Sequence, residues 1–478
     1  MRLFFIGLLA IGVLNISHAQ EFKIESSKAY KKANPNEVYE VVFATPYGFS
    51  TYSYLKNVFL DNTKAINITK YDQQLNAFET KTFNLPKLDL RAADLDKVIE
   101  LETKLIFISN SMSKKKGVRE IYAQVYDSET GAISEHQIIA SYAIDSYSKS
   151  GQLEVNASED KTKIVVFANL PYVKKTNEKI KTWVFDNQLQ PLWSAAHDLI
   201  VDSERAHDQD VNVSNDGVVY VTKRHDYNSK KATSTIITIT DNSVSETVIS
   251  EPTFYVRNTS LVNIGTENLI AGYYFEGNVP KVDYNSLEGN ATTGVFLYSP
   301  NSKKLLGKHP FNPAEGNVKD LTSIAPLHAN VIGDDIYLIG EKQTYTSKFK
   351  SDKSTDLDYI YTHGPTVITN LDTKGTLKNM RLLYNDTTFK NENSEKSSIA
   401  TVVLNGGLKL FYNKNDFTIS SYFNTDKVTY NMLATKYESG SSASSYLVPQ
   451  SLKMVDDYNL IYFVATNGET YWLNKMSW

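Results

Sequence analysis

The sequence repeats one pattern of short strands at a nearly constant interval. Its clearest marker is a polar turn between two strands, which falls at Asp72, Asp127, Asp186, Asp241 and Ser299. These positions are 55, 59, 55 and 58 residues apart, and Asp372 follows 73 residues later, across a longer insertion. A fixed period of this length predicts a repeat architecture in which each unit is one small group of strands.

Each repeat contains two strand pairs. The first is a hairpin such as VNVSNDGVVYVTKRHD (211–226), in which apolar residues alternate on either side of a Ser-Asn-Asp-Gly turn. The second is a pair such as TWVFDNQLQPLW (182–193). Four strands per repeat match the blade of a β-propeller better than the coil of a solenoid. A pair of β-sandwiches is the alternative, because it also places strands at short spacing.

We therefore expect an all-β protein, a β-propeller of seven or eight four-stranded blades that forms a single domain over residues 20–478. The last repeat has only three evident strands before Trp478. The segment EFKIES (21–26) is expected to supply its fourth strand, which closes the ring and removes two exposed sheet edges. Helical periodicity is confined to 90–104, where we expect one or two helical turns.

The first 19 residues have the pattern of a signal peptide. Arg2 precedes an apolar run from Leu3 to Leu14, and the small residues Ser17 and Ala19 stand at the −3 and −1 positions of a cleavage site. The run is shorter than the ~20 apolar residues that span a membrane. We expect export to the periplasm or to the extracellular face of the cell surface, and no transmembrane segment after cleavage.

Composition excludes several kinds of site. The chain has no cysteine, which rules out disulfides, thiolate metal sites and a cysteine nucleophile. Its net charge of −4 argues against nucleic acid as a partner, because nucleic-acid-binding domains are usually basic. The HExxH and GxSxG motifs of metalloproteases and serine hydrolases are absent from the sequence. No cofactor and no metal site is predicted.

The longest loops are expected on one face of the disc. If each blade runs through strands A, B, C and D, the connections from B to C and from D to A lie on the same side. The B–C loops are predicted at 110–118, 170–180, 224–233, 277–293 and 343–365, and the last should be a protease-sensitive loop. Long loops on a rigid scaffold are where binding usually occurs.

Two segments beside this face hold the densest group of polar residues, HDLIVDSERAHDQD (197–210) and KRHD (223–226). The predicted ligand-binding residues are Arg205, His207, Asp208, Asp210, Arg224, His225 and Asp226. Such side chains suit an anionic ligand, an acid–base pair or a divalent cation. The alternative is an ordinary solvated loop. Lysines and tyrosines in the B–C loops add a basic, aromatic rim that suits an anionic glycan or an acidic protein surface.

Four features of the sequence together indicate a resemblance to a group of known proteins. They are the export signal, the repeats that end like VFDNQLQPLW (184–193), the absence of cysteine and the Lys/Asn/Tyr-rich composition. The chain resembles uncharacterised exported β-propeller repeat proteins of the Bacteroidetes type, which have no single family name. The resemblance implies a periplasmic or surface-associated binding platform and no catalytic residue. We expect a monomeric, non-catalytic propeller that binds a protein or glycan partner. The alternatives are a polysaccharide-acting lyase or hydrolase and a structural component of an envelope assembly.

Overall fold

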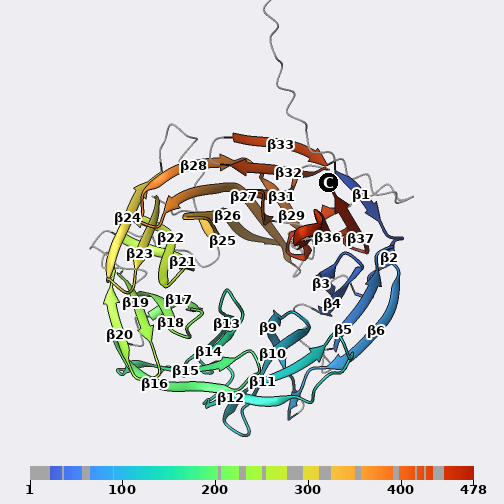
Figure 1. Cartoon of the computed structure of the whole chain (residues 1–478). Helices are drawn as coiled ribbons and strands as arrows, with labels where there is room; N and C mark the ends of the chain where they lie inside the picture. Colours follow the sequence, from blue (N-terminus) through green and yellow to red (C-terminus); the bar gives the residue numbers. More distant parts are fainter. Residues whose placement is uncertain are drawn as a thin grey trace, which may run out of the picture.

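Eight antiparallel sheets follow one another around a ring in the computed structural model of the chain (Figure 1). The prediction of an all-β propeller is confirmed, with eight blades. The structure describes residues 22–34, 37–55, 65–89, 91–202, 206–225, 233–249, 254–276, 294–311, 324–349, 357–390, 398–414, 417–424, 427–433 and 446–478. The predicted signal peptide, residues 1–19, lies outside these ranges. Among the described residues, no helix is both long and apolar enough to cross a membrane.

The first strand of each blade is the innermost and the fourth is the outermost (Figure 1). Blade 1 contains β3 (Glu37–Thr45), β4 (Gly48–Leu55), β5 (Ala65–Asp72) and β6 (Ala77–Asn84). Blade 2 contains β9 (Asp94–Glu100), β10 (Lys104–Ser113), β11 (Val118–Asp127) and β12 (Gln137–Ala143). Blade 3 contains β13 (Gln152–Ala157), β14 (Lys163–Asn169), β15 (Asn177–Asp186) and β16 (Pro191–Asp202). Blade 4 contains β17 (Ala206–Val213), β18 (Val219–His225), β19 (Thr233–Ile239) and β20 (Val244–Val248).

The second half of the ring departs from the four-stranded pattern in blades 6 and 8. Blade 5 contains β21 (Phe254–Ile264), β22 (Glu267–Glu276), β23 (Gly294–Ser299) and β24 (Lys304–Pro310). Blade 6 contains β25 (Ile324–Ile332), β26 (Asp335–Phe349), β27 (Leu357–Asp372), β28 (Leu377–Leu383) and an added β29 (Thr387–Lys390). Blade 7 contains β30 (Ile399–Leu404), β31 (Gly407–Lys414), β32 (Phe417–Asn424) and β33 (Lys427–Leu433). Blade 8 contains β34 (Tyr446–Leu447), β35 (Lys453–Val455), β36 (Leu460–Thr466), β37 (Thr470–Ser477), β1 (Lys23–Ser26) and β2 (Tyr30–Lys31).

The two turns of each repeat lie on the face of the disc opposite the long connections. We call the face with the A–B and C–D turns the turn face, and the face with the B–C and D–A connections the loop face. In blade 4 the A–B hairpin pairs Val213 with Val219, and the Gly217 N–H donates to the Ser214 carbonyl at 3.0 Å. Gly217 has a φ of 87°, which glycine adopts without strain. The predicted order of hairpin turns and B–C connections is confirmed for the described strands, but the B–C loop predicted at 110–118 is wrong, because β10 and β11 extend through it and leave a short turn at 114–117. The loop predicted at 277–293 lies outside the described residues.

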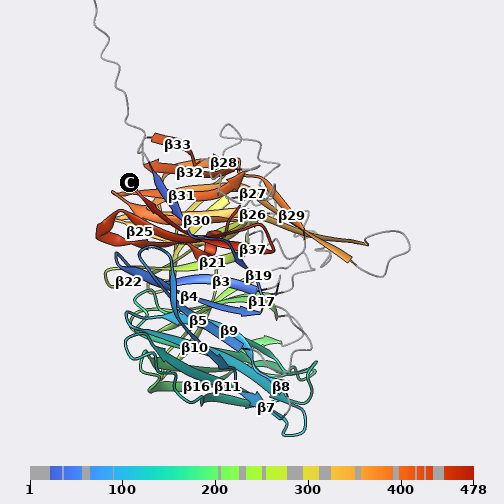
Figure 2. The same cartoon turned by 90° about the vertical axis from the view of Figure 1, so that its right-hand side faces the viewer.

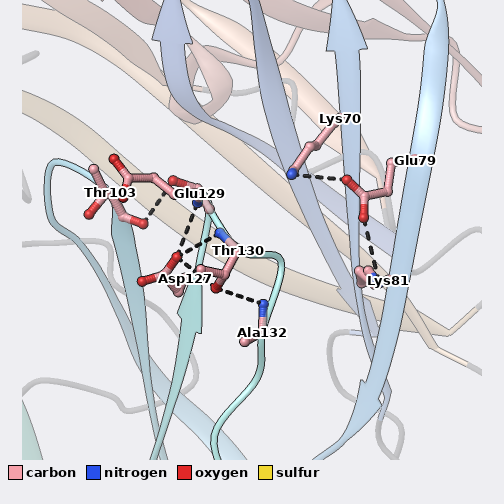
Figure 3. A network of polar contacts seen from close by, with 9 residues as sticks. Lys70, Glu79, Lys81, Thr103, Asp127, Glu129, Thr130 and Ala132 are labelled. Carbon is pink, nitrogen blue, oxygen red and sulfur yellow. Dashed lines mark hydrogen bonds and ion pairs between the residues drawn. The ribbon is translucent and has the colours of Figure 1, made fainter.

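The periodic aspartates close the C–D hairpins. The Oδ1 of Asp127 accepts bonds from the backbone N–H groups of Thr130 at 2.9 Å and Glu129 at 3.1 Å, and the Thr130 bond contributes most to a lowered pKa of Asp127 (Figure 3). At Asp72, Asp186 and Asp372 the carboxylate likewise accepts two backbone bonds, from the second and fourth residues that follow it. In blade 4 the hydroxyl of Thr240, beside Asp241, accepts the corresponding turn bonds. In blade 1, Lys70 and Glu79 pair across such a hairpin at 2.9 Å (Figure 3). Each C–D turn needs a side chain that accepts bonds from its backbone N–H groups, and this need explains why an acidic or polar residue recurs once in each repeat.

The apolar core is divided into eight layers, one between each pair of neighbouring blades. Blade 3 contributes Val165 and blade 4 contributes Val211 to one layer, and Leu338 of blade 6 packs with Leu269 of blade 5 in another. The remaining layers join the other six neighbouring pairs, including blade 8 with blade 1. Because the alternating side chains of every blade face two neighbours, each blade depends on both.

The N-terminal strand completes blade 8, as the sequence predicts. β1 pairs with β37 along its whole length, with Ile24 opposite Met476. The ring of Phe22 meets the ring of Trp478 edge-on at 5.8 Å, and the Ser26 hydroxyl donates to the Asn474 side chain at 2.7 Å. The two ends of the described chain are therefore joined in one sheet (Figure 1).

The helical turns predicted at 90–104 are wrong. The described part of this stretch contains β8 (Arg91–Ala92), which pairs with β7 (Lys87–Leu88), and then β9. A β-bulge in β9 inserts Asp96 as an extra residue between Leu95, which lies opposite Ser109, and Lys97, which lies opposite Ile108. The extra residue interrupts the two-residue alternation and produces a spacing that resembles a helical period.

A charge placed at Ile24 should open the ring. Ile24 packs against the apolar layer between blades 7 and 8, so an Ile24→Asp variant of the chain starting at Gln20 should lose roughly 3 kcal/mol of unfolding free energy. Lys23 is exposed, and Lys23→Ala should change it by less than about 0.5 kcal/mol. Urea unfolding followed by tryptophan fluorescence compares the two. Equal stability of both variants would contradict closure by β1.

Lys409 gives the closed ring a defined pH dependence. Its side chain is buried beneath the Phe22 ring, with Nζ 4.5 Å from the ring centre, and burial lowers its pKa to about 8. Since the unfolded lysine titrates near 10.4, stability should rise between about pH 8 and pH 10.4, where only the unfolded chain remains protonated. Lys409→Met should remove this rise and add roughly 1 to 3 kcal/mol at pH 7. Parallel pH profiles of the two proteins would contradict the assignment.

Candidate functional site

The structure places five of the seven predicted ligand-binding residues on the first two strands of blade 4, β17 and β18. The side chains of Asp210 and Arg224 are described. His207, Asp208 and His225 are placed in β17 and β18 by their backbones alone. Arg205 and Asp226 lie outside the described residues. The assignment of this group to a ligand stays a prediction.

Arg224 and Asp210 form a buried ion pair between blades 4 and 5. The Arg224 side chain is 3% exposed, and its Nη1 lies 3.2 Å from Oδ2 of Asp210. The same carboxylate oxygen accepts bonds from the N–H of Thr259 at 2.9 Å and from its hydroxyl at 3.1 Å. Thr259 belongs to β21, the innermost strand of blade 5. The pair therefore links neighbouring blades beneath the loop face.

The preceding residue, Lys223, makes a second buried link in the opposite direction. Its Nζ lies 2.6 Å from Oε1 of Glu178 and 3.1 Å from Oδ1 of Asn169, both in blade 3. Asn169 in turn donates to the side chain of Gln209 in β17 at 2.7 Å. Successive residues of a strand point to opposite faces, so Lys223 faces blade 3 and Arg224 faces blade 5. The sequence signal for this pair is two adjacent charges at the end of an apolar strand.

Blade 6 holds a carboxylate–histidine pair that the sequence reasoning missed. Glu341, in β26, is completely buried. Its Oε2 lies 2.9 Å from Nδ1 of His363, and its Oε1 accepts a bond from the side chain of Asn385 at 3.1 Å. Thr366 donates to the other end of the Asn385 amide at 3.0 Å. A carboxylate held in this way keeps the neutral imidazole protonated at Nδ1 and leaves Nε2 as the basic nitrogen.

A second histidine lies near this pair. His328 is on β25, the innermost strand of blade 6, and its side chain is exposed. Desolvation by the surrounding protein lowers its pKa, and the charge of Glu341 opposes this shift. The lowered pKa favours the neutral imidazole of His328 over its charged form. Within the described ranges, no group of three or more His, Asp or Glu side chains is arranged to hold a metal ion.

The segment 343–365 is a β-arm where the sequence predicted a long loop. β26 and β27 continue beyond the blade and stay paired as far as Phe349 and Leu357, and β29 pairs with β27 from Ile360 to His363. Residues 350–356 lie outside the described ranges. The first strand of the arm contains Thr344, Tyr345 and Thr346, the second contains the run from Tyr359 to Thr362, and these β-branched and aromatic residues favour strand pairing over an open loop. The arm projects from the disc on the loop face (Figure 2).

One side of the arm is aromatic. Directly opposed residues share a face of a sheet, so Tyr361 and its partner Phe389 lie on the same side as Tyr359, two residues away. Phe349 also belongs to this side and is 65% exposed. The Phe389 ring meets Tyr446 of blade 8 at 5.6 Å. The base of the arm therefore reaches blade 8, beyond the neighbouring blade 7. On the aromatic side of the arm, the row of aromatic side chains ends at His363.

No protein-family model and no curated protein matches the sequence. Several solved structures align with most of the chain at low sequence identity and low TM-score. Polysaccharide lyase Uly1 is 9% identical, with coverage of 80% of this chain and 89% of its own, at a TM-score of 0.37. The β-propeller domain of the Trilobed protease from Pyrococcus furiosus is 11% identical, with coverages of 86% and 95% and a TM-score of 0.37. The WD40 domain of SCAP from fission yeast is 9% identical, with coverages of 95% and 98% and a TM-score of 0.37.

Removing one partner of the Lys223–Glu178 ion pair should lower the free energy of unfolding more than removing both partners together. Lys223→Met leaves the Glu178 carboxylate buried without its cation and should cost about 3 to 5 kcal/mol of unfolding free energy. The double variant Lys223→Met/Glu178→Gln removes both charges and should recover most of that loss. Urea unfolding of the two single variants and the double variant gives the coupling. Additive losses would contradict the buried pair.

Proposed function

We propose that the chain is an exported, non-catalytic propeller that binds a protein or glycan partner through its loop face. The observation that carries this proposal is the aromatic β-arm of blade 6, which stands beyond the disc and exposes Phe349 and Tyr359. Large exposed aromatic side chains on a rigid support provide contact area at a low entropic cost. The ring of blades supplies that support, and the protein would act in the periplasm or at the cell surface.

The residues of blade 4 have two roles in this proposal. The Arg224 side chain is buried and that of Asp210 is mostly buried, so they would hold β17 and β18 in position and act on the partner through their electric field. Arg205, His207, Asp208, His225 and Asp226 would make the direct contacts. This division follows from the burial of the first two, and it suits an anionic partner because the nearby B–C loop of blade 3 also carries Lys174 and Lys175.

A polysaccharide-acting enzyme is the second candidate, and one observation favours it. Lyases and hydrolases need an acid and a base at fixed positions. Glu341 fixes the ring of His363, and His328 lies near the same carboxylate. The two candidates are separable because Glu341→Gln and His363→Gln would abolish turnover of a polysaccharide and leave the affinity of a simple binding protein largely unchanged.

The arm provides a direct test of the binding proposal. Phe349→Ser and Tyr359→Ser should each weaken binding by about tenfold or more, as expected for exposed aromatic residues at the centre of an interface. Phe78→Ser is the matched control, because Phe78 is 67% exposed and lies on β6 of blade 1. Binding is measured on a glycan array and by pull-down from envelope extract, followed by titration of the captured ligand.

Loss of binding in the arm variants alone would support the proposal. Equal binding by all three variants and the parent would remove the arm from the interface. Arg205→Ala and His207→Ala, tested in the same assays, separate the blade 4 loops from the arm. If neither pair of variants changes binding, the loop face is not the binding surface.

A further inference from the structure

The outermost strand of blade 3 is a long, exposed sheet edge. β16 has 12 residues, and the outermost strands of the other blades have no more than 8 over the described residues. It lies on the outer rim of the disc, where its sheet partner among the described strands is β15 (Figure 1). β16 contains no lysine, the residue that most often protects such an edge, so it can serve as a template for a further strand.

Three residues of β16 direct their backbone groups away from the sheet. The Lys179 carbonyl accepts a bond from the Leu170 N–H at 2.8 Å, so Lys179 bonds toward β14. Its partner in β16, Asp198, therefore turns its N–H and C=O to the outer side. Ala196 and Ser194 do the same, because backbone groups alternate between the two sides of a strand.

One end of this edge is already closed by blade 4. The Ile200 N–H donates to Oε1 of Glu246 at 3.0 Å. Within the described ranges, no group takes such a place against the outward N–H and C=O groups of Ser194, Ala196 and Asp198, and all three residues are exposed. We call the stretch Ser194–Asp198 the open edge. Its outward backbone groups are available to another strand.

The exposed side chains of β16 follow the same order in both directions from Ala196. Ser194 and Asp198 are polar and lie two residues away on either side. Leu192 and Ile200 are apolar, lie four residues away and are 47% and 80% exposed. A strand with this order is complementary to a second copy of itself when the two strands run antiparallel.

We propose that two copies of the chain pair antiparallel through the open edge, with a twofold axis at Ala196. Ala196 then faces the partner's Ala196, and two small side chains meet at the axis. Ser194 faces the partner's Asp198, and its hydroxyl donates to that carboxylate. Leu192 meets the partner's Ile200, which buries two exposed apolar side chains. Each directly opposed pair of the open edge exchanges two backbone bonds, so the two copies of blade 3 join in one continuous sheet.

The charge of the open edge selects this register. The Asp198 carboxylate lies 3.7 Å from Nζ of Lys179 in its own chain. With the axis at Ala196, the two copies of Asp198 lie on opposite sides of the axis, about 13 Å apart along the strands. An axis at Asp198 would place the two carboxylates directly opposite each other, which destabilises a strand pair.

This contact goes beyond the proposed function and uses none of the loop-face residues. It also departs from the monomer expected from the sequence. β16 runs from the C–D turn on the turn face toward the loop face, so an antiparallel partner has its own loop face at the opposite end of the joined strands. The dimer therefore carries two partner-binding faces, and a partner with repeated epitopes would bind it with increased avidity.

Single cysteines test the contact, because the chain contains no cysteine of its own. Opposed residues in such a pair have Cα atoms about 5.5 Å apart, which is within the range of a disulfide. Ala196→Cys, in the chain starting at Gln20, should therefore form a cross-linked dimer under mild oxidation, seen on a non-reducing gel. Thr80→Cys is the matched control, since Thr80 is exposed on the outermost strand of blade 1, and it should stay uncross-linked.

Two further cysteine variants test the register. Ser194→Cys and Asp198→Cys should cross-link with each other when the two proteins are mixed, because these positions are opposed across the axis. Each variant alone should stay uncross-linked, since its own equivalent lies about 13 Å away along the strands. A mixture that fails to cross-link, or equal cross-linking of either variant alone, would overturn the proposed pairing.

Proline removes an outward donor without disturbing the blade. The Ala196 N–H points away from β15, so Ala196→Pro keeps the pairing within its own chain and deletes one donor from each copy. In sedimentation equilibrium the parent should dimerise, and Ala196→Pro should raise the dissociation constant of the dimer by about tenfold or more. Thr80→Pro should dimerise as the parent does, because the Thr80 N–H also points away from its neighbouring strand.

A parent that sediments as a monomer at every concentration would overturn the proposal, and so would equal cross-linking of Ala196→Cys and Thr80→Cys. Equal dissociation constants for Ala196→Pro and the parent would show that the dimer uses another surface. None of these results depends on the loop-face partner, so the dimer and the proposed function stand or fall separately.

Discussion

Packing between neighbouring blades is the interaction on which the rest of this structure depends. No blade has a core of its own, because the apolar side chains of each sheet are buried only against the sheets on either side. A ring satisfies this requirement for every blade only if it closes. Closure depends on a short N-terminal strand, β1, that completes the outer side of blade 8 and brings Phe22 against Trp478. The two ends of the described chain therefore meet in the sheet that closes the ring.

Packing between neighbouring blades also explains where the charged side chains are buried. Apolar side chains fill the middle of the interfaces between neighbouring blades. Nearer the loop face, where the strands extend beyond this apolar layer, ion pairs and hydrogen-bonded polar side chains replace them. Lys223 with Glu178, Arg224 with Asp210, and His363 with Glu341 all occupy this level. Each pair is costly to bury and fixes the position of the strand ends that present the loops. The loop face therefore rests on a rigid polar layer, and the β-arm rises from one part of it.

The features predicted correctly from the sequence are those that depend on interactions between residues close together in the chain. The periodic aspartates could be recognised in the sequence because Asp127, Asp72, Asp186 and Asp372 bond to the backbone of their own turns, so each signal is contained within four or five residues. The buried pairs were not recovered, because Lys223 and Glu178 are 45 residues apart and meet only after two blades pack. The arm was mistaken for a loop because its polar threonines conceal a strand. The β-bulge at Asp96 changed the spacing of apolar residues in a strand, so the sequence pattern there wrongly predicted helical turns.

Amide hydrogen exchange in the native protein measures ring closure most directly. If the ring is one cooperative unit, the amides of Glu25 and Ser27, whose N–H groups face β37, exchange with the same opening free energy as those of Val464 and Leu473 in the core of blade 8. That equality is the result expected from a ring that opens only by unfolding. Fast exchange of β1 beside full protection of β36 and β37 would contradict it, because it would show that the ring stands without its N-terminal strand.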